Sequence, residues 1–347
     1  MTTHAYAVET RSGEPLLAVQ DLSVVFQRHG EKPFTAVDGV SFEVRPGQTV
    51  GLVGESGSGK SVTSLAIMGL LPDRGNQVTG TATFEGTDLL TLSKGQMRDR
   101  RGRDLGMIFQ DPLSSLNPVV PIGIQVTEVL ERHKGLSRKA AMPKAREMLD
   151  KVGIPDAERR LKDYPHQLSG GMRQRALIAM ALACEPRLLI ADEPTTALDV
   201  TIQAQILQLL KDLVQDTGTA LIMITHDLGV VAGLCDEVNV MYGGRIVERN
   251  LRHDLFAAPR HPYTHGLLGS IPRLDGARGE PLHPIPGSVT DNLPWASACA
   301  FALRCSQPID VCRTQTPEFV EDGPSALRCH NPVDTRPTRI QDSEVSS

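Results

Sequence analysis

The stretch that decides the fold is LVGESGSGKS, residues 52–61, in which small residues, a lysine and a serine follow an apolar run. It contains the pattern G-x-x-x-x-G-K-[ST], a loop whose backbone N–H groups surround phosphate groups. Gly57 and Gly59 allow the backbone to curl where a side chain would block a phosphate. Lys60 is placed to reach the β and γ phosphates, and the Ser61 hydroxyl to bind Mg²⁺. The stretch therefore predicts a nucleotide-binding loop between a buried strand and a helix.

The residues expected to contact the nucleotide in this stretch form one continuous run: Gly54, Glu55, Ser56, Gly57, Ser58, Gly59, Lys60, Ser61 and Val62. A second apolar stretch, LLIADE at residues 188–193, ends in two acids. Asp192 is expected to enter the Mg²⁺ shell opposite Ser61. Glu193 is expected to polarise the water that attacks the γ phosphate. The alternative is a strand that simply ends at the solvent, and the phosphate loop upstream argues against it.

The composition of the 347 residues indicates a globular protein of about two domains. The net charge of −5 and the low aromatic content of 4% argue against a nucleic-acid binder. No apolar run reaches the length needed to span a bilayer, and the N-terminus does not read as a secretory signal. We therefore expect a cytosolic protein whose membrane role comes through a partner. In a reducing compartment, its six cysteines favour metal or cluster ligation over disulfides.

The order of patterns along the chain predicts an α/β core with a mainly parallel sheet, because apolar strands alternate with helical patterns. Residues 1–15 are expected to be a flexible leader. A nucleotide-binding domain is expected at 16–260, with a helical insertion at about 112–172. The Pro-rich residues 261–335 are expected to form a small C-terminal module, followed by a flexible tail at 336–347.

The stretch QLSGGMRQR, residues 167–175, resembles the signature motif of ATP-binding cassette (ABC) ATPases. Ser169, with the amides of Gly170 and Gly171 at a helix N-terminus, would form a second phosphate cradle. In that family the cradle faces the γ phosphate held by another subunit. Gln174 is expected to belong to the same cradle. LSGG alone would suit an N-capped helix after a glycine turn, but here the other family motifs accompany it.

The remaining motifs of the family follow in its order. Gln110 in GMIFQDP resembles the Q-loop glutamine, Asp199 in TALD the D-loop, and His226 in MITHD the switch histidine. Phe26 matches the upstream aromatic that stacks on adenine, although a strand-core phenylalanine is the alternative. The resemblance, with the two acids, implies catalytic residues and Mg²⁺ ligands as follows: Glu193, His226 and Gln110 for hydrolysis, and Ser61, Gln110 and Asp192 for Mg²⁺.

The fold implied by this resemblance is a RecA-like P-loop nucleotide-binding domain with an antiparallel β subdomain and a helical subdomain. A small irregular Cys-rich module would follow it. QDPLSSLNPVVPIGIQ at residues 110–125 and HPYT at 261–264 resemble the oligopeptide, dipeptide and nickel importer branch. Val120-Pro121 departs from that branch, where an aromatic or polar pair is more usual. The departure leaves the details of partner contact there less defined.

The function implied is that of an ATPase subunit that powers peptide import through partner membrane permeases by ATP-driven dimerisation. The partners would be a second ATPase subunit (a copy or a homologue), two transmembrane permeases and, indirectly, an extracytoplasmic solute-binding protein. Nucleic acid is not expected, and the subunit would lie peripherally at the cytoplasmic face of the membrane. The alternative is a non-transport ABC ATPase that remodels a soluble or nucleic-acid-bound partner.

Four cysteines follow in the pattern C-x₅-C-x₆-C-x₁₆-C: Cys299, Cys305, Cys312 and Cys329. They can supply a Cys₄ site, and such a small segment usually needs a metal or a cross-link to fold. The spacing resembles a [4Fe-4S] site of this importer branch, with zinc or unligated thiols as alternatives. Cys184 and Cys235 are expected in the core. Because no nucleotide motif lies beyond His226, the ATP site is expected to form without this segment.

Overall fold

The computed structural model describes residues 13–27, 30, 32–196, 198–270, 285–289 and 298–334. Its first sheet is antiparallel, with the order β2-β1-β4-β5. The bounds of these strands are β1 Leu17–Phe26, β2 Phe34–Val44, β4 Asn76–Phe84 and β5 Thr87–Asp88. Alternate residues of β1 are buried on either side of an irregularity between Val19 and Leu22, as expected for a strand with one face on a core.

The second sheet has eight strands in the order β11-β12-β10-β9-β3-β8-β7-β6, and the run from β9 to β6 is parallel. Strands β3, β7, β8 and β9 are buried along their whole length. Accordingly, β3, β7 and β8 are largely continuous apolar runs, as is usual for a parallel sheet covered on both faces, whereas β9 also buries Glu237 and Asn239. The bounds are β3 Thr49–Val53, β6 Leu105–Ile108, β7 Leu188–Asp192, β8 Ala220–Thr225, β9 Glu237–Tyr242, β10 Arg245–Leu251, β11 Val320–Asp322 and β12 Ser325–Leu327.

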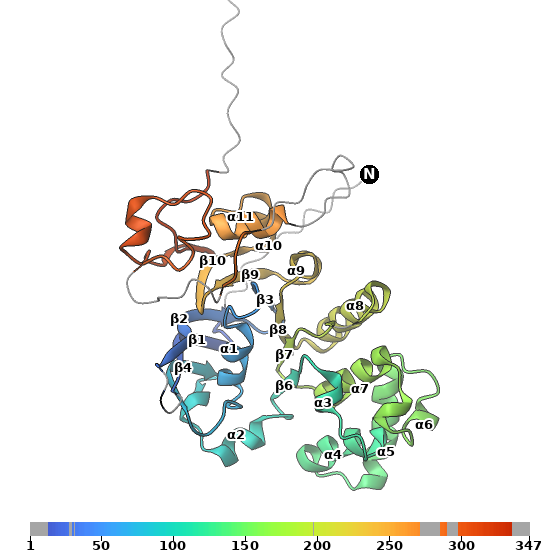
Figure 1. The fold of residues 1–347 in the computed structure, drawn as a ribbon. Helices are drawn as coiled ribbons and strands as arrows, with labels where there is room; N and C mark the ends of the chain where they lie inside the picture. Colours follow the sequence, from blue (N-terminus) through green and yellow to red (C-terminus); the bar gives the residue numbers. More distant parts are fainter. Residues whose placement is uncertain are drawn as a thin grey trace, which may run out of the picture.

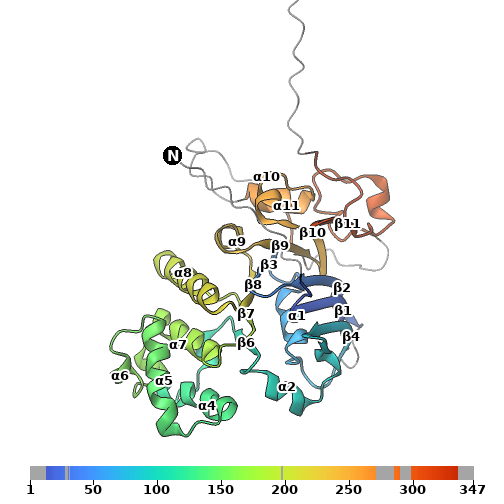
Figure 2. The same ribbon diagram turned by 180° about the vertical axis from the view of Figure 1, so that it is seen from behind.

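The helices fall into two groups (Figures 1 and 2). One group accompanies the two sheets: α1 Lys60–Ile67, α2 Lys94–Arg100, α8 Val200–Thr217, α9 Leu228–Leu234, α10 Arg252–Ala257 and α11 Pro262–Gly269. The other gathers beyond β6 and β7: α3 Pro112–Ser115, α4 Ile122–Lys134, α5 Arg138–Lys151, α6 Ala157–Arg160 and α7 Gly170–Leu182. Short 3₁₀ turns complete the elements: η1 Leu89–Thr91, η2 Pro165–Gln167 and η4 Asp310–Arg313.

The arrangement confirms the predicted cassette fold with an antiparallel sheet, a mainly parallel sheet and a helical region. In parallel strands the carboxyl ends meet at one edge, so the segments after β3, β7 and β8 converge there. Within the part of the chain that the structure describes, no helix has both the length and the apolar character needed to cross a bilayer. The expected leader and tail fall mostly on residues outside the described ranges.

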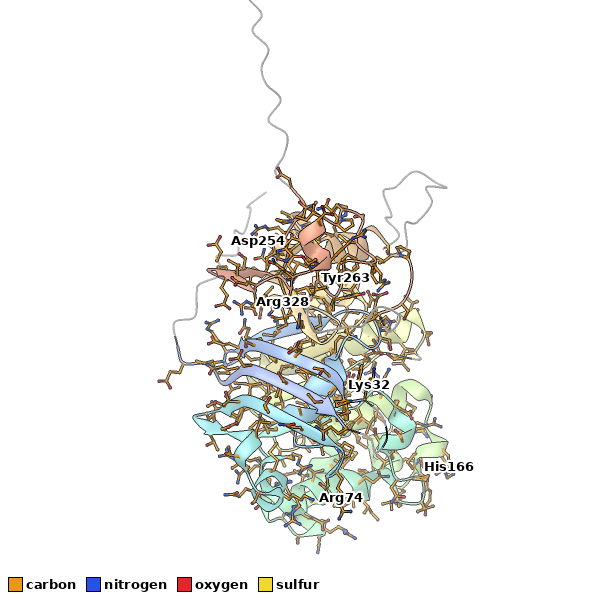
Figure 3. The ribbon with its side chains drawn as sticks, turned by 60° about the vertical axis from the view of Figure 1, so that its left-hand side comes forward. Lys32, Arg74, His166, Asp254, Tyr263 and Arg328 are labelled. Carbon is orange, nitrogen blue, oxygen red and sulfur yellow. The ribbon has the colours of Figure 1, made fainter. Side chains whose placement is uncertain are left out.

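The C-terminal segment differs from the irregular module that the sequence predicts. Its strand β12 pairs with β10 and extends the main sheet, and β11 pairs with β12. The ring of Phe301 lies 5.1 Å from Tyr242 and 5.3 Å from Tyr263, centroid to centroid, within the largest hydrophobic core. Tyr263, labelled in Figure 3, lies in α11 beneath this segment. The segment therefore shares the core of the cassette instead of forming one of its own.

This shared core predicts that Phe301→Ala detaches the C-terminal segment. Replacing a buried phenylalanine by alanine lowers the free energy of unfolding by about 3–5 kcal/mol. Here the lost contacts are those between the C-terminal segment and the core around Tyr242 and Tyr263. Limited proteolysis should show faster cleavage beyond residue 298 and a lower thermal midpoint. Leu303→Ala is the control, because Leu303 lies two residues away and is 69% exposed. Equal protease resistance of the Phe301 variant and the control would contradict the shared core.

Candidate nucleotide-binding site

The phosphate loop passes so close to other backbone segments that two of its positions accept only glycine. Gly54 has φ 154°, and a Cβ there would lie 2.2 Å from the carbonyl oxygen of Met241. Gly59 has φ 101°, and its Cβ would lie 2.6 Å from the carbonyl oxygen of Ala36. The loop leads directly into α1, and no side chain caps this helix at Gly59. The first N–H groups of a helix have no partners within the helix and favour a bound anion. The local geometry therefore agrees with the predicted phosphate cradle.

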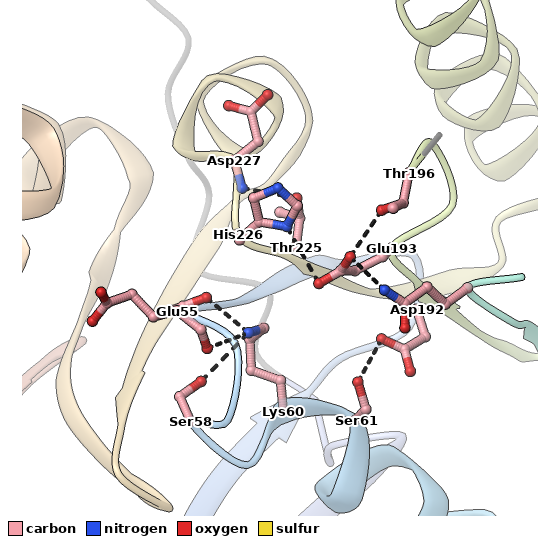
Figure 4. A network of polar contacts seen from close by, with 12 residues as sticks. Glu55, Ser58, Lys60, Ser61, Asp192, Glu193, Thr196, Thr225, His226 and Asp227 are labelled. Atoms are coloured by element: carbon pink, nitrogen blue, oxygen red, sulfur yellow. Dashed lines mark hydrogen bonds and ion pairs between the residues drawn. The ribbon is translucent and has the colours of Figure 1, made fainter. Parts of the chain in front are cut away.

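Lys60 is a buried cation held over its own loop (Figure 4). Its Nζ donates to the carbonyl oxygens of Gly54 at 2.7 Å and Glu55 at 2.9 Å, and to Ser58 Oγ at 3.4 Å. Burial lowers the pKa of the lysine, while the nearby carboxylates of Glu193, Asp192 and Glu55 raise it. These carboxylates offset part of the cost of burying the charge.

Ser61 and Asp192 come together from α1 and from the end of β7. The Ser61 hydroxyl donates to Asp192 Oδ1 at 3.0 Å. Burial raises the pKa of Asp192, and the hydrogen bond from Ser61 opposes that effect. A hydroxyl and a carboxylate side by side are oxygen ligands of the kind that Mg²⁺ prefers. The pair therefore fits the Mg²⁺ site that the sequence predicts.

Glu193 lies at the centre of the polar network in Figure 4. Its backbone is left-handed, with φ 46°, as the chain turns out of β7. Oε2 accepts from Thr196 Oγ1 at 2.8 Å and from Gln110 Nε2 at 2.9 Å, and Oε1 lies 3.3 Å from His226 Nδ1. The structure therefore places the Gln110 amide against Glu193, whereas the sequence predicts it beside Ser61 and Asp192 as a Mg²⁺ ligand.

The protonation of Glu193 suits a general base. Burial raises its pKa, but hydrogen bonds with Thr196 and His226 and the positive charge of Lys60 outweigh this and lower it overall. A side chain that takes a proton from water must itself be deprotonated. Glu193 meets that condition at neutral pH.

The signature residues begin α7, in the helical group and apart from α1 (Figure 1). Ser169 caps the helix by accepting from the N–H of Met172 at 3.3 Å, and both Ser169 and Gly170 are exposed. Gln174 differs from the expectation, because it is only 1% exposed. Facing the interior of its own chain, Gln174 has no surface to offer a second subunit in this arrangement.

Two further predicted positions lie outside the network. Phe26 ends β1, pairs across the sheet with Phe34 and is half-buried against the core of the antiparallel sheet, where Val62 also packs. This position suits either the adenine or the core role. Asp199 is exposed and caps α8 by accepting from the N–H of Ile202 at 3.0 Å.

Two C-terminal residues that sequence reasoning gave no role contact the phosphate loop. The Tyr263 hydroxyl accepts from the N–H of Glu55 at 2.9 Å, and Arg304 pairs with both carboxylate oxygens of Glu55, at 2.7 and 2.9 Å. HPYT is visible in the sequence, but nothing in it points to the loop. Arg304 lies 249 residues from its partner and belongs to no motif. The ATP site and the segment beyond His226 are therefore joined, contrary to the separation expected.

The four C-terminal cysteines lie around one pocket, which His330 also lines. The N–H of Cys299 donates to the carbonyl oxygen of Cys312 at 2.9 Å. Burial raises the pKa of the thiols of Cys299, Cys305 and Cys329, the last to about 11. Among the described residues, no three His, Cys, Asp or Glu side chains meet closely enough to hold one metal ion. The thiols thus share a pocket without the spacing of a single-ion site.

The other two cysteines confirm their expected place in the core. Cys184 is buried, and its Sγ lies 3.7 Å from the carbonyl oxygen of Val129. Cys235 is buried next to Gly51, and burial raises the pKa of its thiol. Both are inert, apolar positions in this fold.

Comparison with known proteins gives two family matches. The family described as ABC transporter matches residues 37–196, and the oligopeptide/dipeptide transporter C-terminal region matches residues 247–312. The dipeptide transport ATP-binding protein DppD of Bacillus subtilis is 55% identical over 300 residues, 86% of this chain and 89% of that protein. The oligopeptide transport ATP-binding protein OppD of Escherichia coli is 49% identical over 325 residues, 93% and 95% of the two chains.

Solved structures show the same cassette fold. A dimeric ATP-binding cassette in a post-hydrolysis state, bound to ADP and phosphate, superposes with a TM-score of 0.60 and 26% identity. The match covers 68% of this chain and 98% of that one. CbiO1 of Clostridium perfringens, part of an ABC transporter complex, gives a TM-score of 0.58 and 28% identity over 71% and 92% of the two chains.

The position of Glu193 predicts that Glu193→Gln abolishes hydrolysis without abolishing nucleotide binding. The amide keeps the shape and can still accept from Thr196, but it cannot take a proton, which costs about 10²- to 10⁴-fold in rate. Steady-state phosphate release and equilibrium ATP binding are the two measurements. Lys60→Ala is the contrasting variant, since the loss of a charged donor should weaken ATP binding itself by about 1.5–3 kcal/mol. Near-normal hydrolysis by the Glu193 variant would remove it from the catalytic role.

Proposed function

Because the chain belongs to the ABC transporter ATP-binding proteins that carry the oligopeptide/dipeptide transporter C-terminal region, we propose that it powers peptide import by hydrolysing ATP. One observation supports this proposal above the others. The same chain contains a phosphate loop closed over Lys60, the polar network around Glu193, and the transporter C-terminal region. The relatives described as dipeptide and oligopeptide transport proteins match it over most of its length.

The site residues divide the work of hydrolysis among them. The phosphate loop and Lys60 hold the β and γ phosphates, and Ser61 with Asp192 would hold Mg²⁺. Bound Mg²⁺ neutralises charge on the phosphate oxygens. Glu193 orients the attacking water and accepts its proton, while Thr196 and His226 hold the carboxylate in place. Phe26 is the proposed adenine contact.

The second half of each ATP site would come from another ATPase subunit, a copy or a homologue. Ser169, Gly170 and Gly171 of that subunit would close over the γ phosphate, and Asp199 would lie at the interface. Ser169 and Gly170 are exposed, and α7, which they begin, lies apart from α1, the helix that follows the phosphate loop (Figure 1). Both observations support an action across subunits. A solved relative of the cassette is dimeric with ADP and phosphate bound.

Closing and reopening of this dimer would move two membrane permeases docked near Gln110 and the helical region at about 112–172. The ATPase subunit would thus lie at the cytoplasmic face of the membrane, with a solute-binding protein on the other side. The domain division proposed is 16–260 for the cassette and 261–335 for the C-terminal segment. Remodelling of a soluble partner, the alternative, is less favoured because the importer C-terminal region is present.

Purification from detergent-solubilised membranes tests this function directly. Two membrane permeases and a second ATPase are the expected companions, and deletion of the gene should abolish growth on peptides as nitrogen source. A Glu193→Gln chain restored to that strain should assemble with the permeases without restoring growth. Ribosomal or DNA-repair companions would overturn transport in favour of remodelling.

The trans cradle predicts that Gly170→Asp blocks dimer closure while leaving the monomer intact. A Cβ at Gly170 finds its nearest atom, Leu198 Cδ2, at an ordinary 3.7 Å, and an acid suits the first turn of a helix. Gly171 is a poorer choice, because its Cβ would lie 2.9 Å from Ile202 Cγ2. ATP binding by the isolated subunit should stay unchanged while hydrolysis falls at least about a hundredfold. ATP-driven dimerisation of the variant in gel filtration would contradict the trans cradle.

We propose the cysteine pocket as the site of a [4Fe-4S] cluster, in which each of four irons takes one thiolate. Zinc is the alternative, and it would require the four thiols to move together around one ion. What supports it is that four thiols of one segment line one pocket. Cys299, Cys305, Cys312 and Cys329 would be the ligands as thiolates. Burial raises the pKa of the thiols of Cys299, Cys305 and Cys329, so the positive charge of the bound metal must stabilise their thiolates. When bound, such a group would cross-link a segment that contains little regular secondary structure.

This site predicts about four iron and four sulfide per chain after anaerobic purification. Cys312→Ser should lower the iron content and the broad visible absorbance, because one of four ligands is lost. Cys184→Ala is the control and should keep both, since Cys184 lies in another part of the core. Stoichiometric zinc without iron would convert the site to a zinc site. Four freely titratable thiols would end the metal proposal.

A further inference from the structure

Arg304 is a buried arginine whose hydrogen bonds join the C-terminal segment to the phosphate loop. Its side chain is 2% exposed, and Nη1 and Nη2 donate to Glu55 Oε2 and Oε1 at 2.7 and 2.9 Å. Its other donors reach the carbonyl oxygens of residues 285–287 and the Tyr242 hydroxyl. The guanidinium also lies over the Tyr242 ring, at 5.7 Å from the centroid. Such a planar, two-bond pair has a defined geometry that a single charge contact lacks.

Glu55, the second residue of the phosphate loop, is thereby held at three points. Its N–H donates to the Tyr263 hydroxyl at 2.9 Å, its carbonyl accepts from Lys60 Nζ at 2.9 Å, and its carboxylate accepts from Arg304. Two of these three partners come from beyond the last nucleotide motif, His226. A phosphate loop acts through the directions of its backbone N–H groups. A residue clamped on its main chain and its side chain therefore helps to set those directions.

We propose that Arg304 is a positioning residue for the phosphate loop, through which the cysteine-bearing C-terminal segment sets the affinity for the nucleotide. The proposal deepens the proposed function, on whose ATP site it rests. Arg304 directly precedes Cys305, and the turn that carries it begins at Cys299, whose N–H is bonded to Cys312. Whatever orders these cysteines also orders Arg304. Coupling of this kind is reciprocal, so nucleotide binding must in turn order residues 298–305.

The pairing of Glu55 with Arg304 also affects the charge balance around Lys60. The carboxylate of Glu55 is one of three that act on the buried ammonium group. Paired with Arg304, this carboxylate is neutralised; without Arg304, an unpaired negative charge remains beside a loop that must accept phosphate. Loss of Arg304 therefore both frees the loop and adds a repulsive charge, and both changes weaken nucleotide binding.

The test measures binding of MgADP by calorimetry, so that hydrolysis does not enter. Arg304→Gln should weaken MgADP roughly tenfold, within the range usual for coupled sites, and Arg304→Lys by less. In steady-state hydrolysis the KM for ATP should rise while kcat at saturation stays within about twofold, because Glu193 is untouched. The control is Arg249→Gln. It breaks the 2.7 Å pair between Arg249 and Glu321, which also joins the cassette to the segment, and should leave MgADP affinity unchanged.

Glu55→Ala approaches the pair from the loop side, and this single variant still serves if Arg304→Gln fails to fold. Where Arg304→Gln folds, the two variants form a double-mutant cycle. Glu55→Ala removes the carboxylate that pairs with Arg304 and acts on Lys60, but it keeps the main-chain groups that bond to Tyr263 and Lys60. The double variant should bind MgADP no more weakly, within about twofold, than the weaker single variant, because contacting residues are not additive. Hydrogen exchange of residues 298–305 should slow on MgADP binding in the wild type and not in Glu55→Ala.

Three outcomes would overturn the proposal. The first is an unchanged MgADP affinity in Arg304→Gln, even though its C-terminal segment has become sensitive to protease. The second is a double variant whose loss of MgADP affinity equals the sum of the losses in the two single variants. The third is an equal loss of MgADP affinity in Arg304→Gln and Arg249→Gln. The first would leave Arg304 with a structural role in its own segment alone. Failure of the wild-type chain to bind MgADP would instead count against the proposed function itself.

Discussion

The close packing of three backbone segments at the phosphate loop is the constraint on which the nucleotide site depends. Gly54 lies against the carbonyl of Met241, and Gly59 against that of Ala36. The N–H of Gly244, in the turn between β9 and β10, donates to the carbonyl of Ser58 at 2.8 Å. Side chains at these glycines would push the segments apart. The loop thus ties the antiparallel sheet to the main sheet, and it takes its shape from both.

A second constraint is electrostatic. One buried cation, Lys60, lies among the carboxylates of Asp192, Glu193 and Glu55, which arrive from different parts of the chain. Each carboxylate has a further partner of its own: Ser61 for Asp192, Thr196 and His226 for Glu193, and Arg304 for Glu55. Charges buried in this way are stable only when each is paired. The same pairing holds every side chain in the direction that its chemistry requires.

The C-terminal segment takes part in both constraints. Through Phe301 it adds to the aromatic core around Tyr242 and Tyr263, and through β12 it extends the main sheet. Through Arg304 it neutralises a carboxylate of the phosphate loop. A segment with little regular structure is therefore ordered by the cassette that it covers. In return, the cassette receives the two hydrogen bonds from Arg304 that hold the Glu55 carboxylate.

The sequence by itself determined the local chemistry of this protein: the phosphate loop, the acids that end β7, the histidine after β8, and the signature at the start of α7. These depend on short stretches in which residue type and spacing specify backbone shape, so the cassette fold and most of the site were predictable. Only the tertiary structure decided that Gln174 faces inward, that Gln110 contacts Glu193, and that Arg304 reaches Glu55. Such contacts join residues far apart in the chain, and no local pattern encodes which distant side chains the packing of the sheets brings together.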